Sequence, residues 1–313
     1  MLLGSGIQAR ISFQLQGQAM NDKLKFTGER FTPECEREIW YEHLHRYAFA
    51  LEFCKGKRVL DAACGEGYGT AVLASQAKSV TGVDISSEAI NHASARYSDR
   101  PGVQFEVADC CDLPFENNSF DLVVSFETIE HLEGQEKMLA SFRRVLVDNG
   151  LLVLSSPDKA EYTDRMGFDN EFHVSELYRE ELTSLIDGHF SASRILGQSL
   201  AFHSVIAAEG PVDKVTLQTM DGQGQFRTGS RLQAPVYLIA LCAANEDLLP
   251  EVSGRTWLFD DLESTVYKHY HHEIRKNIRA GGILAEREAK IEELQRRLAS
   301  ADRPWWKRLF GGD

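Results

Sequence analysis

Short apolar runs alternate with segments of helical periodicity through the middle of the chain. The apolar runs predict strands at 58–63, 79–83, 103–108, 120–125 and 150–155. The segments between them carry the spacing of amphipathic helices at 70–77, 86–97 and 135–145. Strands that alternate with helices in this way predict an α/β fold with a doubly wound, Rossmann-like parallel sheet.

The flanking regions are less regular. Helices are predicted through 39–51 and 179–186, strands at 193–200 and 236–243, a loop at 222–231, and a long helical pattern from about 262 to 300. Four regions follow from these patterns: a tail at 1–25, a main domain at 26–244, a helical extension at 245–300, and a basic aromatic tail at 301–313. The first tail is either disordered or an artefact of the start site, with Met20 as the alternative start.

Composition narrows the class of protein. The 313 residues are 43% hydrophobic and 26% charged, which suits a globular chain with one large domain and an appendage. A net charge of −13 argues against a nucleic-acid partner, which needs basic surface. The six scattered cysteines indicate reduced thiols, and the first residues lack the features of a signal peptide. We therefore expect a cytoplasmic protein.

The segment VLDAACGEGYG, at 59–69, leads a strand through a glycine-rich turn into a helix, which is the geometry of a nucleotide site. A dinucleotide fingerprint that starts at Gly65 would need glycine where Thr70 stands, and no Gly-Lys-Ser/Thr follows for a phosphate loop. Instead Asp61, Asp84 and Asp109 close three successive strands. Carboxylates without a cationic phosphate clamp predict an adenosine that carries a positive or zwitterionic group.

These residues resemble the class I S-adenosylmethionine-dependent methyltransferases of the type 11 and type 23 groups. The resemblance covers about 55–158, through TGVDIS, VADCCDLPFENNSFDLVVSFETIEHL and GLLVLSSP. It implies a seven-stranded sheet and S-adenosylmethionine as the cofactor, with Asp61 near the methionine end, Asp84 on the ribose and Asp109 on the adenine. The implied cofactor-binding set is Asp61, Ala63, Gly65, Gly67, Asp84, Ile85, Asp109, Cys110 and Phe126.

Candidate catalytic residues follow the fourth predicted strand. Glu127, Glu130 and His131 lie at i, i+3 and i+4, so they share a face if the segment forms a helical turn, and His173 follows the fifth strand. Three interpretations are open. His131 or His173 acts as a metal-free general base oriented by a carboxylate such as Glu130. Alternatively, all four side chains bind a divalent metal, Mg²⁺ or Mn²⁺, that lowers the pKa of an acceptor hydroxyl. In the third, Glu130 and His131 are structural and cap the following helix.

The metal interpretation also rests on a resemblance. The E-x-x-E-H spacing with a later histidine is similar to that of metal-dependent small-RNA 2′-O-methyltransferases, and a similar element occurs in ubiquinone-pathway O-methyltransferases. This chain is acidic and shows no RNA-binding module, which separates it from the RNA enzymes.

The segment before the first strand supplies candidates for a lid or an acceptor site. In the methyltransferase family this region commonly folds over the cofactor, which implies such a role for Glu29, Arg30, Tyr41, His45 and Arg46. The alternative is a solvated amphipathic helix with ordinary ion pairs. TGERF followed by this helix also resembles methyltransferases of bacterial surface-polysaccharide synthesis.

The C-terminal region leaves two further alternatives. Leu284, Ile291 and Leu298 are seven residues apart, which predicts either a short coiled coil at 284–298, for a homo-oligomer or a partner helix, or a lone helix packed on its own domain. The segment 304–310, PWWKRLF, mixes aromatic and basic side chains and predicts peripheral contact with an anionic membrane.

The resemblance to surface-polysaccharide methyltransferases, together with the C-terminal tail, implies O-methylation of a sugar hydroxyl in bacterial glycan synthesis (O-antigen, lipopolysaccharide or capsule), at the inner face of the cytoplasmic membrane. One alternative acceptor is a small phenolic or quinone-like molecule. The other alternative is a catalytically idle scaffold of a glycan-assembly complex.

Overall fold

A computed structural model describes residues 38–201, 203–206, 215–220, 223–229, 234–260 and 264–301. The chain divides into two compact units, Met1–Phe259 and Asp260–Asp313. The predicted tail at 1–25, with Met20, lies outside the described residues, as do Glu29, Arg30 and the aromatic segment 304–310.

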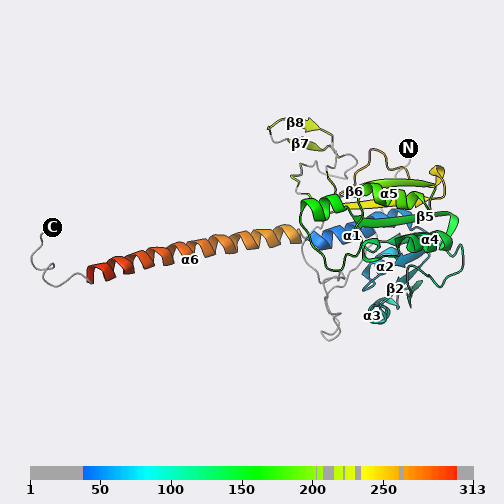
Figure 1. The fold of residues 1–313 in the computed structure, drawn as a ribbon, viewed down its shortest axis with the longest axis horizontal. Helices are drawn as coiled ribbons and strands as arrows, with labels where there is room; N and C mark the ends of the chain where they lie inside the picture. Colours follow the sequence, from blue (N-terminus) through cyan, green and yellow to red (C-terminus); the bar gives the residue numbers. More distant parts are fainter. Residues whose placement is uncertain are drawn as a thin grey trace, which may run out of the picture. The chain divides into compact units, whose positions relative to one another are not determined.

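The first unit is built on a seven-stranded sheet in the order β3-β2-β1-β4-β5-β9-β6 (Figure 1). Its strands are β1 (Arg58–Ala62), β2 (Ser79–Asp84), β3 (Val103–Val107), β4 (Phe120–Ser125), β5 (Leu146–Pro157), β6 (Ala192–Gln198) and β9 (Tyr237–Ala243). Its α-helices are α1 (Glu38–Ala50), α2 (Tyr68–Leu73), α3 (Ser87–Tyr97), α4 (Gln135–Val145) and α5 (Arg179–Asp187). A small hairpin pairs β7 (Gln218–Met220) with β8 (Phe226–Thr228).

Both faces of the sheet are covered, because successive strand residues enter two different hydrophobic cores. In β1, Leu60 packs in the core that contains Met138 and Phe142 of α4, whereas Val59 packs in the core that contains Tyr47 of α1 and Leu73 of α2. Strands buried on both faces are apolar at nearly every position, which is why they appear as continuous apolar runs in the sequence.

The observed sheet refines the sequence prediction in three places. The five strands from β1 to β5 are parallel as predicted, but β9 is antiparallel to both β5 and β6. A parallel neighbour needs a crossover, usually a helix, and the residues described between β6 and β9 contain only the β7–β8 hairpin. That hairpin extends into the predicted loop at 222–231. Ser86 caps α3 by accepting a hydrogen bond from the amide of Ala89, as predicted.

The boundary between the units lies after Phe259, beyond the expected domain end at residue 244. Leu249 is buried, and the Trp257 ring meets Phe49 of α1 edge-on, with centroids 4.9 Å apart. Residues 245–259 therefore pack with the main domain, and the helical extension is confined to the second unit.

The second unit contains α6 (Thr265–Ala301), a helix of 37 residues that would be about 55 Å long at 1.5 Å per residue. Leu284, Ile291 and Leu298 are exposed on it, and ion pairs such as Lys290–Glu293 run along its surface. Oligomerisation through 284–298 stays a prediction. Among the described residues, no helix is both long and apolar enough to cross a bilayer.

Candidate active site

The glycine-rich loop between β1 and α2 forms one wall of the site. Gly67 has a φ of 89°, and a Cβ at this position would lie 2.6 Å from the Cβ of Ala93. A Cβ at Gly69 would lie 2.0 Å from Cζ of Tyr47. Glycine is therefore needed here for a left-handed backbone and for close packing of the loop against α3 and α1.

Asp61, at the end of β1, is fully buried and accepts hydrogen bonds from Thr70 Oγ1 at 2.6 Å and from the Tyr47 hydroxyl at 3.2 Å. Burial raises the pKa of Asp61 to about 6. The hydrogen bonds from Thr70 and Tyr47 favour the ionised form and oppose this shift. These two hydrogen bonds fix the orientation of the carboxylate.

The other two predicted acids are also held by the protein. Asp84 accepts hydrogen bonds from the amides of Gly65 at 3.0 Å and Ser86 at 2.9 Å, and Asp109 accepts one from the amide of Cys111 at 2.8 Å. Because β3, β2, β1 and β4 are neighbours in the sheet, their carboxyl ends bring these acids to one edge.

The remaining members of the predicted cofactor set lie along the same edge. Ala63 has a φ of 59° beside the glycine loop, and Ile85 is 73% exposed directly after β2. Cys110 is buried, and burial raises the pKa of its thiol to about 12. Phe126 is buried and meets the ring of Tyr47 edge-on, with centroids 5.1 Å apart. An exposed Ile85 leaves apolar surface for a ligand ring.

Glu127 begins the second wall, and it does not belong to the helical turn that the spacing allowed. Its φ is 50°, and only Ile129–His131 form a short 3₁₀ turn, η2. Ser155 of β5 holds Glu127 twice, since its Oγ accepts from the Glu127 amide at 3.0 Å and donates to Oε1 at 2.6 Å. Glu127 is consequently directed toward Arg46, 3.8 Å away, and is absent from the metal-like cluster described next.

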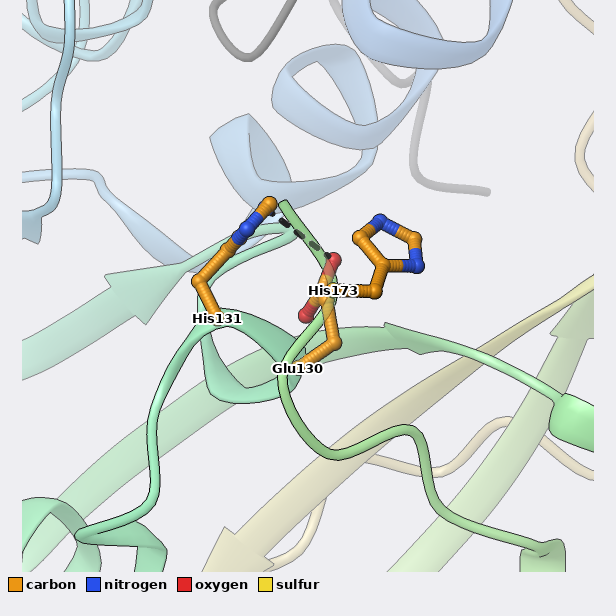
Figure 2. Close-up of side chains that lie close together, drawn as sticks. All are labelled: Glu130, His131 and His173. Atoms are coloured by element: carbon orange, nitrogen blue, oxygen red, sulfur yellow. Dashed lines mark ion pairs between the residues drawn. The ribbon is translucent and has the colours of Figure 1, made fainter. Parts of the chain in front are cut away.

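Glu130, His131 and His173 do gather, with one ligand atom of each within 4.8 Å of the others (Figure 2). The two histidines are far apart in the sequence, but their rings meet nearly at right angles with centroids 5.1 Å apart. The backbone oxygen of Glu130 accepts hydrogen bonds from the amides of Val174 and Ser175, which tethers the loop carrying His173 to the end of β4.

Each imidazole is oriented through its Nδ1 atom. His131 Nδ1 lies 2.8 Å from the carbonyl oxygen of Phe172, which can only accept, and His173 Nδ1 bonds the carboxylate of Glu176. With the proton on Nδ1, the Nε2 atom of each ring can bind a metal or take up a proton, and Nε2 of His131 lies 4.0 Å from Oε1 of Glu130.

Glu130 is the least satisfied side chain in this wall. It is 1% exposed, and neither carboxylate oxygen has a hydrogen-bond partner among the residues that the structure describes. Burial, with the charge of Glu127, raises its pKa well above the ordinary value. An ionised carboxylate in this setting needs a cation. The donor set of one carboxylate and two imidazoles therefore fits a divalent metal as well as a protonated histidine.

The predicted lid residues of α1 separate into two groups. The rings of Tyr41 and His45 pack on Phe259, with centroids 5.6 and 5.5 Å apart. Arg46 is 1% exposed, so the alternative of a solvated helix is wrong at this position. Its Nη1 donates to Gln198 at 2.8 Å, and its guanidinium lies 4.8 Å from the ring centre of Tyr237.

Several residues of the site escaped the sequence analysis: Tyr47, Thr70, Ser155, Glu176, Gln198 and Tyr237. Only Glu176 carried a usable signal, because it follows His173 by three residues, a spacing that suits a side-chain contact. The others reach the site through long-range packing.

Several known proteins are similar to this chain in sequence. A family model described as a methyltransferase domain matches residues 60–154. Two probable S-adenosylmethionine-dependent methyltransferases from strains of Mycobacterium tuberculosis are 38% identical over 168 residues, which cover 52% of this chain and 60% of each relative. The chain thus spans less than two thirds of their length.

A probable S-adenosylmethionine-dependent methyltransferase from Mycolicibacterium smegmatis is 34% identical over 197 residues, which cover 61% of this chain and 74% of that relative. A solved Bacillus structure, of the YcgJ protein, aligns with a TM-score of 0.47 and 18% identity, over 65% of this chain and 100% of that one. The chain belongs to the family of S-adenosylmethionine-dependent methyltransferases and takes S-adenosylmethionine as its cofactor.

Proposed function

We propose that this protein transfers the methyl group of S-adenosylmethionine to a hydroxyl of a sugar in a bacterial glycan. The observation that carries the proposal is the cluster of Glu130, His131 and His173 beside the carboxyl ends of β1 and β4. A sulfonium methyl is already activated, so the protein has to align the acceptor and remove its proton. When the acceptor is a hydroxyl, its proton has to be removed.

The cluster supports a hydroxyl rather than an amine as the acceptor. Some relatives are phosphoethanolamine N-methyltransferases, for example one from Triticum aestivum that is 31% identical over 51% of this chain and 30% of its own length. A neutral amine attacks through its own lone pair and needs no base beforehand. Two imidazoles with Nε2 lone pairs beside a buried carboxylate are suited to taking up a proton, or to holding a cation that acidifies a hydroxyl.

A divalent cation, Mg²⁺ or Mn²⁺, would be held by Glu130, His131 and His173. When bound, it would lower the pKa of the acceptor hydroxyl. The chain's own part is to orient both imidazoles, through Phe172 and Glu176, and to supply the charge of Glu130. Without a metal, the same histidines would act as the general base with Glu130 beside them.

The acceptor is tested with glycan taken from the source bacterium. A strain that lacks this gene should lose methyl groups from its surface glycan by mass spectrometry. Purified protein should then transfer label from methyl-labelled S-adenosylmethionine to the glycan of that strain, and not to wild-type glycan, whose sites are filled. Label that appears only in small phenols or lipids would contradict the proposal.

The metal is tested by titration of chelator-treated protein with Mn²⁺, followed by electron paramagnetic resonance. One site per chain is expected in the wild type, and H131Q and H173Q should weaken it. His189→Gln is the matched control, because His189 pairs with exposed Glu136 outside the cluster. Full label transfer in protein that holds no metal would favour the metal-free base.

A further inference from the structure

Two aromatic rings outside the cluster of Glu130, His131 and His173 connect it to the surface. The Tyr162 ring lies against the imidazole of His173, with centroids 5.4 Å apart and planes 33° from parallel. Phe168 packs on Tyr162, with centroids 5.0 Å apart, and Phe168 is 49% exposed. Because His173 also meets His131, a continuous row of rings leads from exposed Phe168 to the cluster.

The backbone brings these two rings together. Ala160–Arg165 form a π-helix, η3, a rare element that is frequent at functional sites. The chain then turns at Gly167, whose φ is 71°, and the Phe168 amide donates to the carbonyl oxygen of Tyr162 at 3.2 Å. The Phe168 ring consequently rests on Tyr162 at the surface.

Glu176 fixes this segment relative to His173. One of its carboxylate oxygens accepts a hydrogen bond from Thr163 of η3, and the other contacts Nδ1 of His173. Thr163 directly follows Tyr162 in the chain, so a single carboxylate holds both the aromatic segment and the imidazole. A flat ring held beside a group that can take up a proton is suited to orienting a reactant.

The exposed apolar side chains of this segment indicate the kind of reactant. Met166 and Val174 are exposed as well as Phe168, and all three lie within nine residues around His173. An acceptor with an apolar face would cover such surface. A sugar ring has this character, because its C–H groups can pack on the electron-rich face of an aromatic ring while its hydroxyls stay free for hydrogen bonds.

The charge of the segment discriminates among sugars. Residues 158–180 contain seven acidic and three basic side chains. Two of the bases are engaged, since Lys159 lies over the ring of Tyr178 and Arg165 pairs with Glu161. The remaining excess of negative charge would repel an anionic ring and accept a neutral one.

We propose that Phe168 and Tyr162 form an aromatic platform on which the acceptor ring packs, and that this ring is an uncharged sugar rather than a uronic acid or a sugar phosphate. The assignment rests on the proposed function and makes its acceptor specific. The sugar ring lies on Phe168 and directs one hydroxyl toward His173. A phenol could pack on the same rings, and the experiment separates the two acceptors.

The platform is tested by label transfer from the full chain to glycan of the strain that lacks the gene. Phe168→Ala should raise KM for this acceptor about tenfold and leave kcat within about twofold, because packing on Phe168 holds the acceptor equally before and during transfer. Phe168→Tyr restores the ring and should recover most of the lost affinity. Phe226→Ala is the matched control and should change neither constant, because Phe226 is 80% exposed on the separate two-stranded sheet of β7 and β8.

Contact with the platform is followed without methyl transfer by fluorine NMR. In protein labelled with 4-fluorophenylalanine, the signal that disappears in F168Y belongs to Phe168. This signal should shift when the uncharged fraction of the glycan is added. The fraction retained by an anion exchanger should shift it less and should take up less label.

A KM unchanged in F168A, or an unmoved Phe168 signal, with the acceptor that takes label would overturn the platform. If no acceptor takes label, an unmoved signal with the uncharged fraction overturns it as well. Preferential labelling of the acidic fraction would overturn the assignment to an uncharged sugar. Label in small phenols alone, with a raised KM in F168A, would refute the proposed glycan acceptor and leave the platform in place, so the two failures are distinguishable.

Discussion

The two walls of the site differ in how far the protein satisfies its own polar groups. On the wall formed by β1, β2 and β3, all three acids are hydrogen-bonded by the chain: Asp61 by Tyr47 and Thr70, Asp84 by two amides, and Asp109 by one. On the wall formed by β4, β5 and α1, Glu130 has no hydrogen-bond partner among the described residues, and neither do the Nε and Nη2 atoms of Arg46.

The first wall is thus fixed by hydrogen bonds and packing within the chain, whereas polar groups of the second wall keep capacity for further hydrogen bonds. Glu130 lies 4.0 Å from His131 and Arg46 lies 3.8 Å from Glu127, so each has an oppositely charged neighbour to which it makes no hydrogen bond. Variants on the first wall should mainly change stability, whereas variants on the second should mainly change binding and transfer.

The largest effect is expected at Glu130. Glu130→Gln replaces the carboxyl group beside the two histidines by an amide, which can neither bind a cation as strongly nor exchange a proton, so label transfer to the glycan acceptor should fall by at least about a hundredfold. Cofactor affinity should stay within about twofold, because the glycine loop and Asp61 are untouched. Glu133→Gln, on an exposed neighbour, serves as the control. A variant E130Q with near-normal transfer would make Glu130 structural.

Asp61 should affect the pH dependence of stability. Its pKa in the folded protein is about 6, above the ordinary 3.8, so the folded state holds the proton more tightly than the unfolded state. The free energy of unfolding of the wild type therefore loses a contribution as pH rises from about 4 to about 6. An asparagine side chain in place of Asp61 does not titrate.

Relative to the wild type, D61N should consequently gain about 2 kcal/mol between pH 4 and pH 6.5, whatever it loses through altered hydrogen bonds. Urea unfolding at a series of pH values measures this difference. A constant difference across that range would show that Asp61 has an ordinary pKa.

Gly69→Ala tests the close packing of the first wall. The added methyl would meet the ring of Tyr47, so a loss of about 1–3 kcal/mol in the free energy of unfolding is expected. Gly281→Ala is the matched helical control, because nothing lies within 4 Å of the added Cβ in α6. There alanine should stabilise the helix by about 0.5–1 kcal/mol. Equal stability of G69A and wild type would contradict the packing argument.

The smallest effect is expected at Arg58, whose guanidinium pairs with Asp121 at the surface. Arg58→Gln should cost about 0.2–1 kcal/mol in the free energy of unfolding, and less at high salt. A salt-independent loss of several kcal/mol would refute this view of Arg58.

Local sequence patterns predicted much of the fold and of the wall formed by β1, β2 and β3. The strands from β1 to β5 and the helices between them were predicted because burial on both faces leaves a continuous apolar signal. Asp61, Asp84 and Asp109 were found because each lies at the end of a predicted strand. The antiparallel β9 was not predicted, since strand direction depends on the connection and not on the strand's own residues.

On the second wall the sequence identified the candidate residues but not how they are placed relative to one another. Glu130, His131 and His173 were all candidates, and the structure brings them together. Glu127 was expected to join them through a helical turn, but Ser155 holds it in a left-handed conformation that directs it to Arg46. No pattern in FETIEHL encodes a hydrogen bond to a residue of the neighbouring strand.

By itself the sequence determined the α/β class, the glycine loop and the acids at the strand ends, because these depend on residues close to one another along the chain. Only the tertiary structure decided which polar groups are paired. Arg46 meets Gln198 across 152 positions, and His131 reaches the carbonyl of Phe172 across 41. Burial and pairing at such separations arise from the packing of the whole sheet, so the partners of Arg46 and His131 are determined only once the chain is folded.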